Sequence, residues 1–486
     1  MQVESESSLS DTSPHPAAFI DGCWLSTTDT FDIEDRFSGA FVARVGHAGG
    51  PEVASATAAA ARYHAAPGLP PFARATLIDA LCREIVADRQ GLVATIIAET
   101  GFTTADAEGE FSRAIDTLKL SSEAARSLVG EVIPFAGWSS GAGRTGWTMR
   151  VPVGPVLAIT PFNSPLNTVL HKVAPAIAAG NPVILKPSEK TPLTAARLIA
   201  ATERAGFPPG LVGLLQGNGA VLVPLILSDP RIAYVAFTGS TAVGVAIQAQ
   251  SGLRRTQMEL GSIASTIIMA DADLARAARL CASAAFRKAG QVCTSIQVLL
   301  VQDRIHAAFR EAFVAAASDL PVGDPRAAGT VVGPMISEAA ARKVDAMVEE
   351  ALARGAAALL RGTRKGALLP PVILEGGAPE MRLRCEEAFG PVVCMVPFGT
   401  LDEAITIANA TPYGLSAGVF TASIETAFRC AEAIDAGAVH INQTSSSRVD
   451  VMPYGGVKAS GFGREGPHHA VREMTVERLV TFTAGD

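Results

Sequence analysis

Three residues that lie far apart in the chain have side chains that together could oxidise an aldehyde. Cys293 follows a Gly-Gln turn, Glu259 lies in Met-Glu-Leu-Gly, and Asn163 closes a predicted strand. A thiolate can attack the carbonyl carbon, an amide can hold the oxyanion, and a carboxylate can activate water to hydrolyse the thioester. Each residue also has an ordinary interpretation: a buried structural cysteine, a solvated glutamate, and an asparagine that caps a turn.

The composition indicates a large chain with an ample core and no basic surface. The 486 residues are 48% hydrophobic and carry a formal net charge of −7, which disfavours a nucleic-acid partner. No apolar run is long enough to span a bilayer, so we expect no membrane partner. Residues 1–16 are acidic and Ser-rich, which predicts a disordered tail and no secretory signal. We therefore expect a cytoplasmic protein.

The seven cysteines are scattered, with neither CxxC nor Cys/His ligand spacing. This pattern is typical of a reducing compartment and predicts no metal site. Apart from Cys293, we interpret the cysteines as small buried hydrophobes.

The order of predicted elements indicates two α/β halves. Residues 19–22 contain an Asp-Gly hairpin signal, and residues 50–130 are Ala-rich with helical spacing. Thr191 and Pro192 are suited to be the N-cap and first residue of a helix. From residue 151 onward apolar strands alternate with helices, which predicts parallel βαβ units. The predicted strands span 154–160, 182–185, 212–215, 232–237, 266–269, 415–420 and 438–442.

Seven segments, taken in order, resemble those of the aldehyde dehydrogenase superfamily. The resemblance extends from about residue 17 to the C-terminus, and the text is most similar to the lactaldehyde, phosphonoacetaldehyde and semialdehyde dehydrogenases. The segments are PFN (161–163), LKPSEKTP (185–192), FTGSTAVG (237–244), MELG (258–261), AGQVCTS (289–295), EEAFGPVV (386–393) and PYGGVKASGFGREG (453–466).

The resemblance implies an aldehyde dehydrogenase-like α/β fold with three parts. A Rossmann-like cofactor domain is expected at 17–127 and 148–257, and an α/β catalytic domain at 258–467. A small β oligomerisation arm is expected at 128–147 and 468–486, which implies a homodimer or homotetramer. The same resemblance assigns Cys293, Asn163 and Glu259 the catalytic roles described above.

The resemblance also implies NAD as the cofactor, with NADP as the alternative. No GxGxxG opens the βαβ region; instead, residues 237–244 indicate a strand, a glycine turn and a helix start, which could hold a pyrophosphate or be an ordinary capped helix. Glu189 favours NAD, because a carboxylate repels a 2′-phosphate. The predicted cofactor-binding residues are Ile159, Thr160, Pro161, Phe162, Lys186, Ser188, Glu189, Gly219, Phe237, Gly239, Ser240, Val243, Leu260, Gly261, Glu387 and Phe389.

The predicted substrate pocket is polar and cationic. Arg113 and Arg448 could converge on a carboxylate, phosphate or phosphonate, or they could be surface ion-pair residues. Arg287 and Lys288 stand where the family frequently has Phe-Asn, and they either add positive potential or face solvent. The predicted substrate-binding residues are Arg113, Ser164, His171, Thr294 and Arg448.

We therefore expect NAD(P)-dependent oxidation of a small anionic aldehyde to the acid. The first candidate carries a phosphonate, as in phosphonoacetaldehyde or phosphonoformaldehyde; a carboxylate-semialdehyde or lactaldehyde dehydrogenase is the alternative. Glu259 disfavours a coenzyme A-acylating enzyme, because family members of that type commonly lack this carboxylate. The intact catalytic set disfavours a silent structural homologue.

Overall fold

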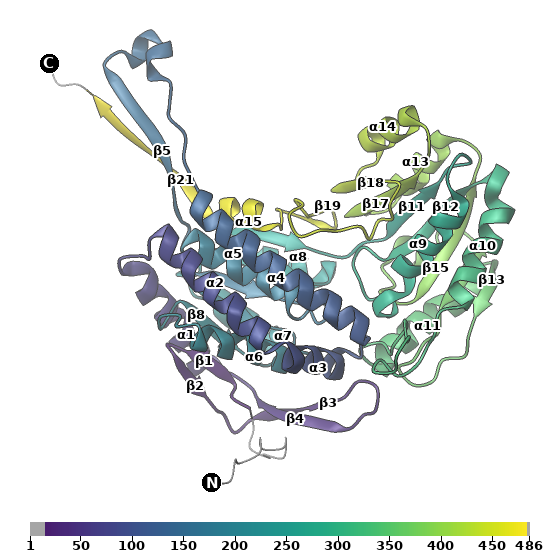
Figure 1. Cartoon of the computed structure of the whole chain (residues 1–486), viewed down its shortest axis with the longest axis horizontal. Coiled ribbons are helices and arrows are strands. Elements are labelled where there is room, and N and C mark those ends of the chain that lie inside the picture. The colour runs from purple at the N-terminus through teal and green to yellow at the C-terminus, as the bar shows by residue number, and fades with distance from the viewer. Residues whose placement is uncertain (1–14, 484–486) are drawn as a thin grey trace.

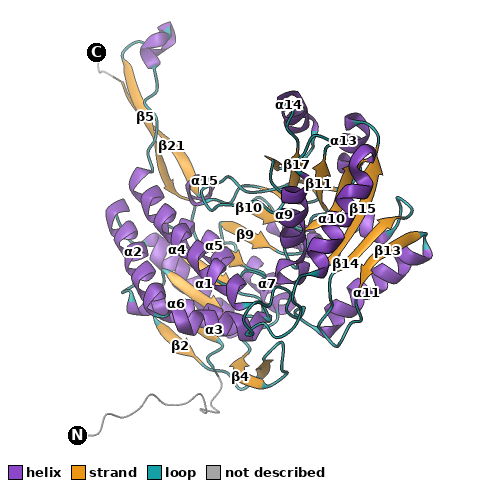
Figure 2. Ribbon diagram, turned by 45° about the vertical axis from the view of Figure 1, so that its right-hand side comes forward, coloured by secondary structure: helices purple, strands orange, loops and turns teal. Residues whose placement is uncertain are grey.

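The computed structural model describes residues 15–483. Of the predicted tail at 1–16, only His15 and Pro16 lie within this range, and residues 484–486 of the predicted arm lie outside it. Two main sheets, each flanked by helices, form the two halves of the body, and a two-stranded arm projects from it (Figures 1 and 2).

The first sheet has eight strands, and its centre is parallel. In spatial order they are β2 (Cys23–Leu25), β1 (Ala18–Ile20), β8 (Val212–Leu215), β7 (Val183–Lys186), β6 (Val156–Ile159), β9 (Tyr234–Thr238), β10 (Arg255–Glu259) and β20 (Gly461–Phe462). The helices of this half are α1 (Gly50–Ala65), α2 (Pro71–Ala87), α3 (Arg89–Thr100), α4 (Thr104–Ser127), α5 (Asn167–Ala179), α6 (Pro192–Arg204), α7 (Gly219–Leu227), α8 (Thr241–Ser251) and α15 (Pro467–Glu473).

The second sheet has seven strands and is parallel except at β13. In spatial order they are β13 (Ala356–Arg361), β14 (Val372–Gly376), β15 (Val392–Phe398), β12 (Ile296–Gln302), β11 (Ala264–Ile268), β17 (Ser416–Phe420) and β18 (Ala438–Ile441). Its helices are α9 (Leu274–Phe286), α10 (His306–Ser318), α11 (Glu338–Ala353), α12 (Arg382–Cys385), α13 (Leu401–Asn409) and α14 (Ile424–Ala433). The short pairs β3 (Thr30–Glu34) with β4 (Phe41–Gly46) and β16 (Tyr413–Gly414) with β19 (Val457–Lys458) stand apart.

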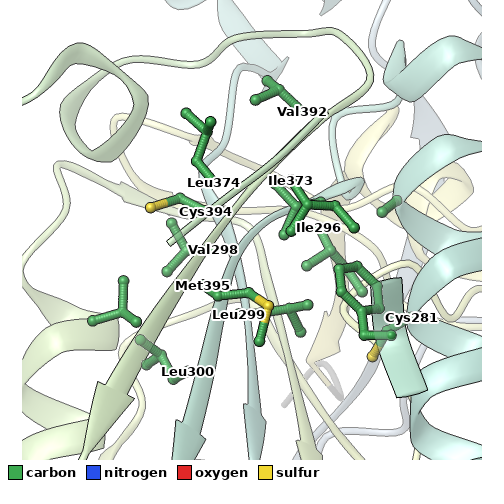
Figure 3. Close-up of a cluster of buried hydrophobic side chains, with 14 of the residues drawn as sticks. Cys281, Ile296, Val298, Leu299, Leu300, Ile373, Leu374, Val392, Cys394 and Met395 are labelled. Atoms are coloured by element: carbon green, nitrogen blue, oxygen red, sulfur yellow. The ribbon is translucent and has the colours of Figure 1, made fainter. Parts of the chain in front are cut away.

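The central strands are apolar because helices cover both faces of a parallel sheet. Every residue of β6, β7, β11 and β17 is buried. Figure 3 shows how β12, β14, β15 and α9 contribute to the core of the second half, with Leu299, Leu374 and Met395 among the labelled side chains. The alternating α/β fold expected from the sequence is therefore confirmed.

The cysteines are only partly as predicted. All seven are free thiols, and Cys281, Cys394 and Cys430 are buried. Cys23 and Cys385, however, are exposed, so their interpretation as buried hydrophobes was wrong. Both lie at the margins of their halves, Cys23 in the edge strand β2 and Cys385 at the end of the short helix α12, where little chain covers them.

The arm consists of β5 (Arg144–Pro152) paired antiparallel with β21 (Thr475–Thr483), which reaches it from the far end of the chain (Figure 1). Trp147 and Phe482 stack across the pair with ring centroids 5.4 Å apart. Helix α15, which falls within the predicted arm segment 468–486, instead packs against α4 and α5 in the body. Its inner residues Ala470 and Val471 are buried there.

Candidate active site

A cavity of about 1180 Å³ is lined by residues from both halves of the body. On one side, β6, β7, β9 and β10 end at the same edge of the first sheet, and the residues that follow them line the cavity. Ligands of open α/β sheets bind at this carboxyl edge. On the other side lie the loop that carries Cys293 and the segment containing Arg448 and Tyr454. All three predicted catalytic residues line this one cavity.

The loop that carries Cys293 has an unusual backbone. It begins in a 3-10 turn, Arg287–Gly290, where three successive residues have positive φ: Lys288 (53°), Ala289 (51°) and Gly290 (69°). The first two pay a steric cost for this conformation, whereas glycine does not. A Cβ on Gly290 would lie 2.1 Å from the Gly390 carbonyl oxygen, so only glycine fits there.

Buried Lys288 clamps this loop in place. Its Nζ donates to Glu110 Oε2 at 2.9 Å and to the Asn163 carbonyl at 2.8 Å, and it lies 4.8 Å from the centre of the Phe102 ring. These contacts connect the loop to α4 and to the segment after β6. Lys288 therefore does not face solvent, and its partners offset the cost of the strained backbone.

Asn163 is tied to the same loop through its side chain. Its Nδ2 donates to the Gln291 carbonyl at 2.9 Å. An amide nitrogen carries two hydrogens, so this bond orients the group and leaves one hydrogen for a ligand. The Cys293 side chain is only partly exposed, and burial raises the pKa of its thiol to about 11, while a hydrogen bond with Tyr454 opposes this rise.

Glu259 ends β10 and is 3% exposed. Neither carboxyl oxygen has a hydrogen-bond partner among the described residues. Burial, followed by repulsion from Glu465, raises the pKa of Glu259 well above its usual range. An unpartnered carboxyl group of this kind in a cavity wall is suited to exchange a proton with a ligand or water.

Every residue that we predicted to bind the cofactor lines the cavity. The part of the cavity around Lys186, Gly219 and Ser240 is its predicted cofactor end. Ser240 is the N-cap residue of α8, but its side chain makes no capping hydrogen bond. The buried Thr160 hydroxyl has no hydrogen-bond partner among the described residues. Lys186 Nζ donates to the Pro187 carbonyl at 2.7 Å, and burial lowers its pKa to about 8. The uncapped start of α8 and the unpartnered Thr160 hydroxyl suit a pyrophosphate and ribose.

The residues predicted for the nicotinamide side lie nearer to Cys293. Glu387 accepts a hydrogen bond from the Ser262 backbone at 3.1 Å, and burial raises its pKa to about 7. A Cβ on Gly261 would lie 2.7 Å from this carboxylate. Phe389, with φ of 53°, meets Phe162 edge-on at 5.9 Å. The close approach of the Gly261 backbone to the Glu387 carboxylate and the rings of Phe162 and Phe389 together suit a flat ring ligand.

The predicted substrate residues occupy different positions. Arg113, Ser164, Thr294 and Arg448 line the cavity, but His171 does not. His171 is 1% exposed and its Nε2 lies 2.8 Å from Asp450 Oδ1. Because α5 is buried along its whole length, His171 lies behind the cavity wall. There it helps to orient the Asp450 carboxylate.

The chain matches the aldehyde dehydrogenase family over residues 24–480. It belongs to this family. It is 38% identical over 463 residues to the 3-sulfolactaldehyde dehydrogenase of Priestia megaterium, covering 95% of this chain and 97% of that protein. It is 42% identical over 412 residues to aspartate-semialdehyde dehydrogenase 1 of Pseudomonas canavaninivorans, covering 85% and 87%. The crystal structure of an NAD-dependent aldehyde dehydrogenase from Sinorhizobium meliloti is similar with a TM-score of 0.94 and 34% identity, covering 98% of this chain and 96% of that one.

These findings confirm the family and the fold class predicted from the sequence. The protein is an NAD(P)-dependent aldehyde dehydrogenase. Within residues 15–483, no helix has the length and apolar character needed to cross a membrane. Over the same range, no group of three or more His, Cys, Asp or Glu side chains is placed to hold a metal ion.

We define the catalytic end of the cavity of this aldehyde dehydrogenase by Cys293, Tyr454, Arg448 and Arg287. Sequence reasoning missed Glu465, which lies at this end. Glu465, 1% exposed, accepts hydrogen bonds from Lys172 Nζ at 2.9 Å and from Arg448 at 2.7 Å. These cations hold its pKa below the usual range. Two acidic residues in one wall, Glu259 and Glu465, therefore have opposite protonation tendencies. Glu465 lies in the segment 453–466, but nothing local marks it as buried.

Proposed function

We propose that Cys293 is the nucleophile, Asn163 the oxyanion donor and Glu259 the general base of this aldehyde dehydrogenase. The Cys293 thiolate attacks the carbonyl carbon, so an S–C bond forms and the carbonyl electron pair moves to oxygen. The free hydrogen of Asn163 Nδ2 and the Cys293 backbone N–H hold that oxyanion. When bound, the nicotinamide of NAD(P) supplies the hydride acceptor. Glu259 then takes a proton from water, which adds to the Cys293 thioester and releases the acid and the thiolate.

We further propose that the substrate is a small anionic aldehyde. The observation that carries this proposal is the position of Arg287. Its guanidinium lines the cavity with Cys293 and donates to Ser446 Oγ at 2.7 Å, without a carboxylate partner among the described residues. Burial lowers its pKa, yet a guanidinium remains charged at neutral pH. A half-buried guanidinium that makes no ion pair among the described residues favours an anionic ligand.

The other two arginines of the cavity differ from Arg287. Arg113 makes a two-pronged ion pair with Asp450, at 2.7 and 3.1 Å. Arg448 donates to Glu465. Both therefore have carboxylate partners, which supports the interpretation as ion-pair residues while leaving both in the wall. In the proposed pocket they add further N–H donors beside Arg287, with Thr294 and Ser164 as neutral ones.

The anion proposed first is a tetrahedral one, as in a phosphonate-bearing aldehyde. The similarity to a 3-sulfolactaldehyde dehydrogenase supports a tetrahedral oxyanion, because a sulfonate shares this shape. The similarity to an aspartate-semialdehyde dehydrogenase supports the alternative, a carboxylate semialdehyde, and lactaldehyde is a further alternative. NAD is proposed over NADP because the exposed carboxylate of Glu189 lies at the cofactor end.

The test of this proposal is NADH formation with phosphonoacetaldehyde, sulfoacetaldehyde, succinate semialdehyde, lactaldehyde and propanal. In the Arg287→Gln variant, kcat/KM for the anionic aldehydes should fall about 10- to 100-fold, because a charged hydrogen bond is lost, while the value for propanal changes little. Arg279→Gln, on the exposed face of α9, is the matched control. Equal losses for propanal and the anions would refute the anion site.

The same assay separates the remaining alternatives. NADH formation that depends on added coenzyme A would indicate an acylating enzyme instead.

We also propose a cytosolic homodimer or homotetramer assembled through the arm. Supporting this, several apolar side chains of the arm are exposed, among them Val132, Trp138, Leu479 and Phe482, and the seven free thiols fit a reducing compartment.

A further inference from the structure

Tyr454 touches the sulfur that the proposed mechanism uses. Its hydroxyl oxygen lies 2.9 Å from Cys293 Sγ, and the tyrosine is 8% exposed. Among the described residues, the Tyr454 hydroxyl is the hydrogen-bond partner of the Cys293 thiol. Tyr454 belongs to the segment 453–466, and neither the proposed mechanism nor the anion pocket uses its hydroxyl.

A closed cluster holds the tyrosine ring in this position. The backbone of Tyr454 exchanges two hydrogen bonds with that of Glu465, at 3.1 and 2.6 Å. The Glu465 side chain binds Arg448, and the Arg448 guanidinium lies 3.7 Å from the centre of the Tyr454 ring. Lys172 fixes the other carboxylate oxygen of Glu465. Because each member restrains the next, the hydroxyl has little freedom to leave the sulfur.

The direction of this hydrogen bond follows from the charges around it. Burial and the nearby thiol raise the pKa of Tyr454 well above its usual value, so the phenol keeps its proton. Around the thiol, burial, Glu387 and Glu259 raise its pKa, whereas the Tyr454 hydroxyl and Arg448 lower it. The Arg287 charge is also felt at the sulfur. Of these groups, Tyr454 is the one that reaches the sulfur directly.

We propose that Tyr454 is a further catalytic residue, which donates its phenolic hydrogen to the Cys293 thiolate and so increases the fraction of ionised thiol in the resting enzyme. This inference rests on the proposed role of Cys293 as the nucleophile. The thiol proton leaves to water in the cavity, and the hydroxyl of Tyr454 keeps its own. When the sulfur lone pair forms the S–C bond, the carbonyl electron pair moves to oxygen, and Tyr454 loses a charged acceptor without transferring a proton.

The experiment is alkylation of the resting protein by iodoacetamide between pH 6 and 10, without cofactor or substrate, followed by peptide mass spectrometry. Cys293 modification is compared in the parent protein and in Tyr454→Phe. The exposed thiols of Cys23 and Cys385 report general reactivity in the same sample. Tyr63→Phe, which removes a hydroxyl from α1 far from the cavity, is the matched control.

Loss of a charged hydrogen bond should raise the thiol pKa by about one to two units. Below that pKa the ionised fraction then falls about 10- to 100-fold. A more basic thiolate is also a better nucleophile, so Cys293 alkylation should slow about 3- to 10-fold. The rates at Cys23 and Cys385 should not change, and neither should any rate in Tyr63→Phe.

A second variant tests the opposite direction and does not depend on the phenylalanine variant folding. Replacing Tyr454 by 3-fluorotyrosine gives a more acidic phenol and hence a stronger donor, so Cys293 alkylation at a fixed pH should be faster than in the parent protein. Unchanged or faster alkylation in Tyr454→Phe, or unchanged or slower alkylation with the fluorinated ring, would overturn the proposal. Either result leaves the nucleophile itself intact, because its own test is loss of turnover in Cys293→Ala.

Discussion

The two ends of the cavity are built on different principles. The cofactor end presents backbone and short side chains that follow the carboxyl ends of β6, β7 and β9, and parts of it, such as Ser240 and Val243, are exposed. The catalytic end presents buried charges: Glu259 and Glu465 are 3% and 1% exposed, and the Cys293 loop has a strained backbone. In the proposed function, the first end holds a ligand mainly through local geometry, whereas at the second end distant partners set the proton affinities.

This difference predicts where single substitutions act most strongly. Changes at the catalytic end remove a group for which the cavity holds no substitute, so they should affect rate by orders of magnitude. Changes at the cofactor end remove one of many shared contacts, so they should affect cofactor choice by smaller factors.

Cys293→Ala should have the largest effect, with turnover reduced to background. No other cysteine lines the cavity, so no thiol can replace it among the described residues. Binding of NAD, measured by fluorescence titration, should remain, because the cofactor end is untouched. NADH formation at the parental rate would contradict the assignment.

Glu259→Gln should reduce steady-state turnover by about 10²- to 10⁴-fold, the usual contribution of a general base. A first stoichiometric burst of NADH should persist, because the thioester still forms. In the parent enzyme, turnover should rise with pH through the elevated pKa of Glu259, since only the carboxylate can accept a proton. This rise should be absent from the variant's turnover after the burst, where thioester hydrolysis limits the rate and Cys293 is already acylated; if the rise remains there, another group is the base.

Asn163→Ala should lower kcat by about 10²- to 10³-fold, the loss typical of one oxyanion donor. The same substitution frees the Gln291 carbonyl and so could loosen the loop. Asn163→Asp is the informative partner, because a carboxylate preserves size but repels an oxyanion. Comparable kcat in the parent and both variants would remove Asn163 from the mechanism.

Glu189→Gln should have the smallest effect. Removing one exposed charge from the cofactor end should shift the NADP-to-NAD ratio of kcat/KM upward by about 5-fold, as expected for roughly 1 kcal/mol. Glu432→Gln, on the exposed side of α14, should leave the ratio unchanged. A loss of turnover with NAD as large as that in Glu259→Gln would break the contrast between the two ends.

The sequence predicted those features that depend on neighbouring residues. The hairpin at residues 19–22 is confirmed as β1 and β2, with Asp21 and Gly22 at φ of 54° and 84°. At α6, by contrast, Thr191 makes no side-chain cap. Instead, Glu99 from α3 accepts from the Leu193 and Thr194 backbones at 2.6 and 2.9 Å, a contact that local spacing could not show.

The sites show the same division. Motif residues such as Gly239 and Cys293 lie in the cavity that their order along the chain predicted. The partners of Arg113 and Lys172 were not predictable, because Asp450 and Glu465 lie 337 and 293 residues away from them in the sequence. Whether Arg287 and Lys288 face solvent also remained open until their contacts with Ser446 and Glu110 were visible.

By itself, the sequence determined the family and the alternating α/β order and predicted the reactive groups, because these depend on residue type and on spacing over a few positions. Only the tertiary structure decided which charges are compensated and which are not. Proton affinity depends on burial and on groups within a few ångströms, and folding brings those groups together from both ends of the chain. Arg287, the cavity arginine that makes no ion pair among the described residues, and the tyrosine on the sulfur of Cys293 are both consequences of that arrangement.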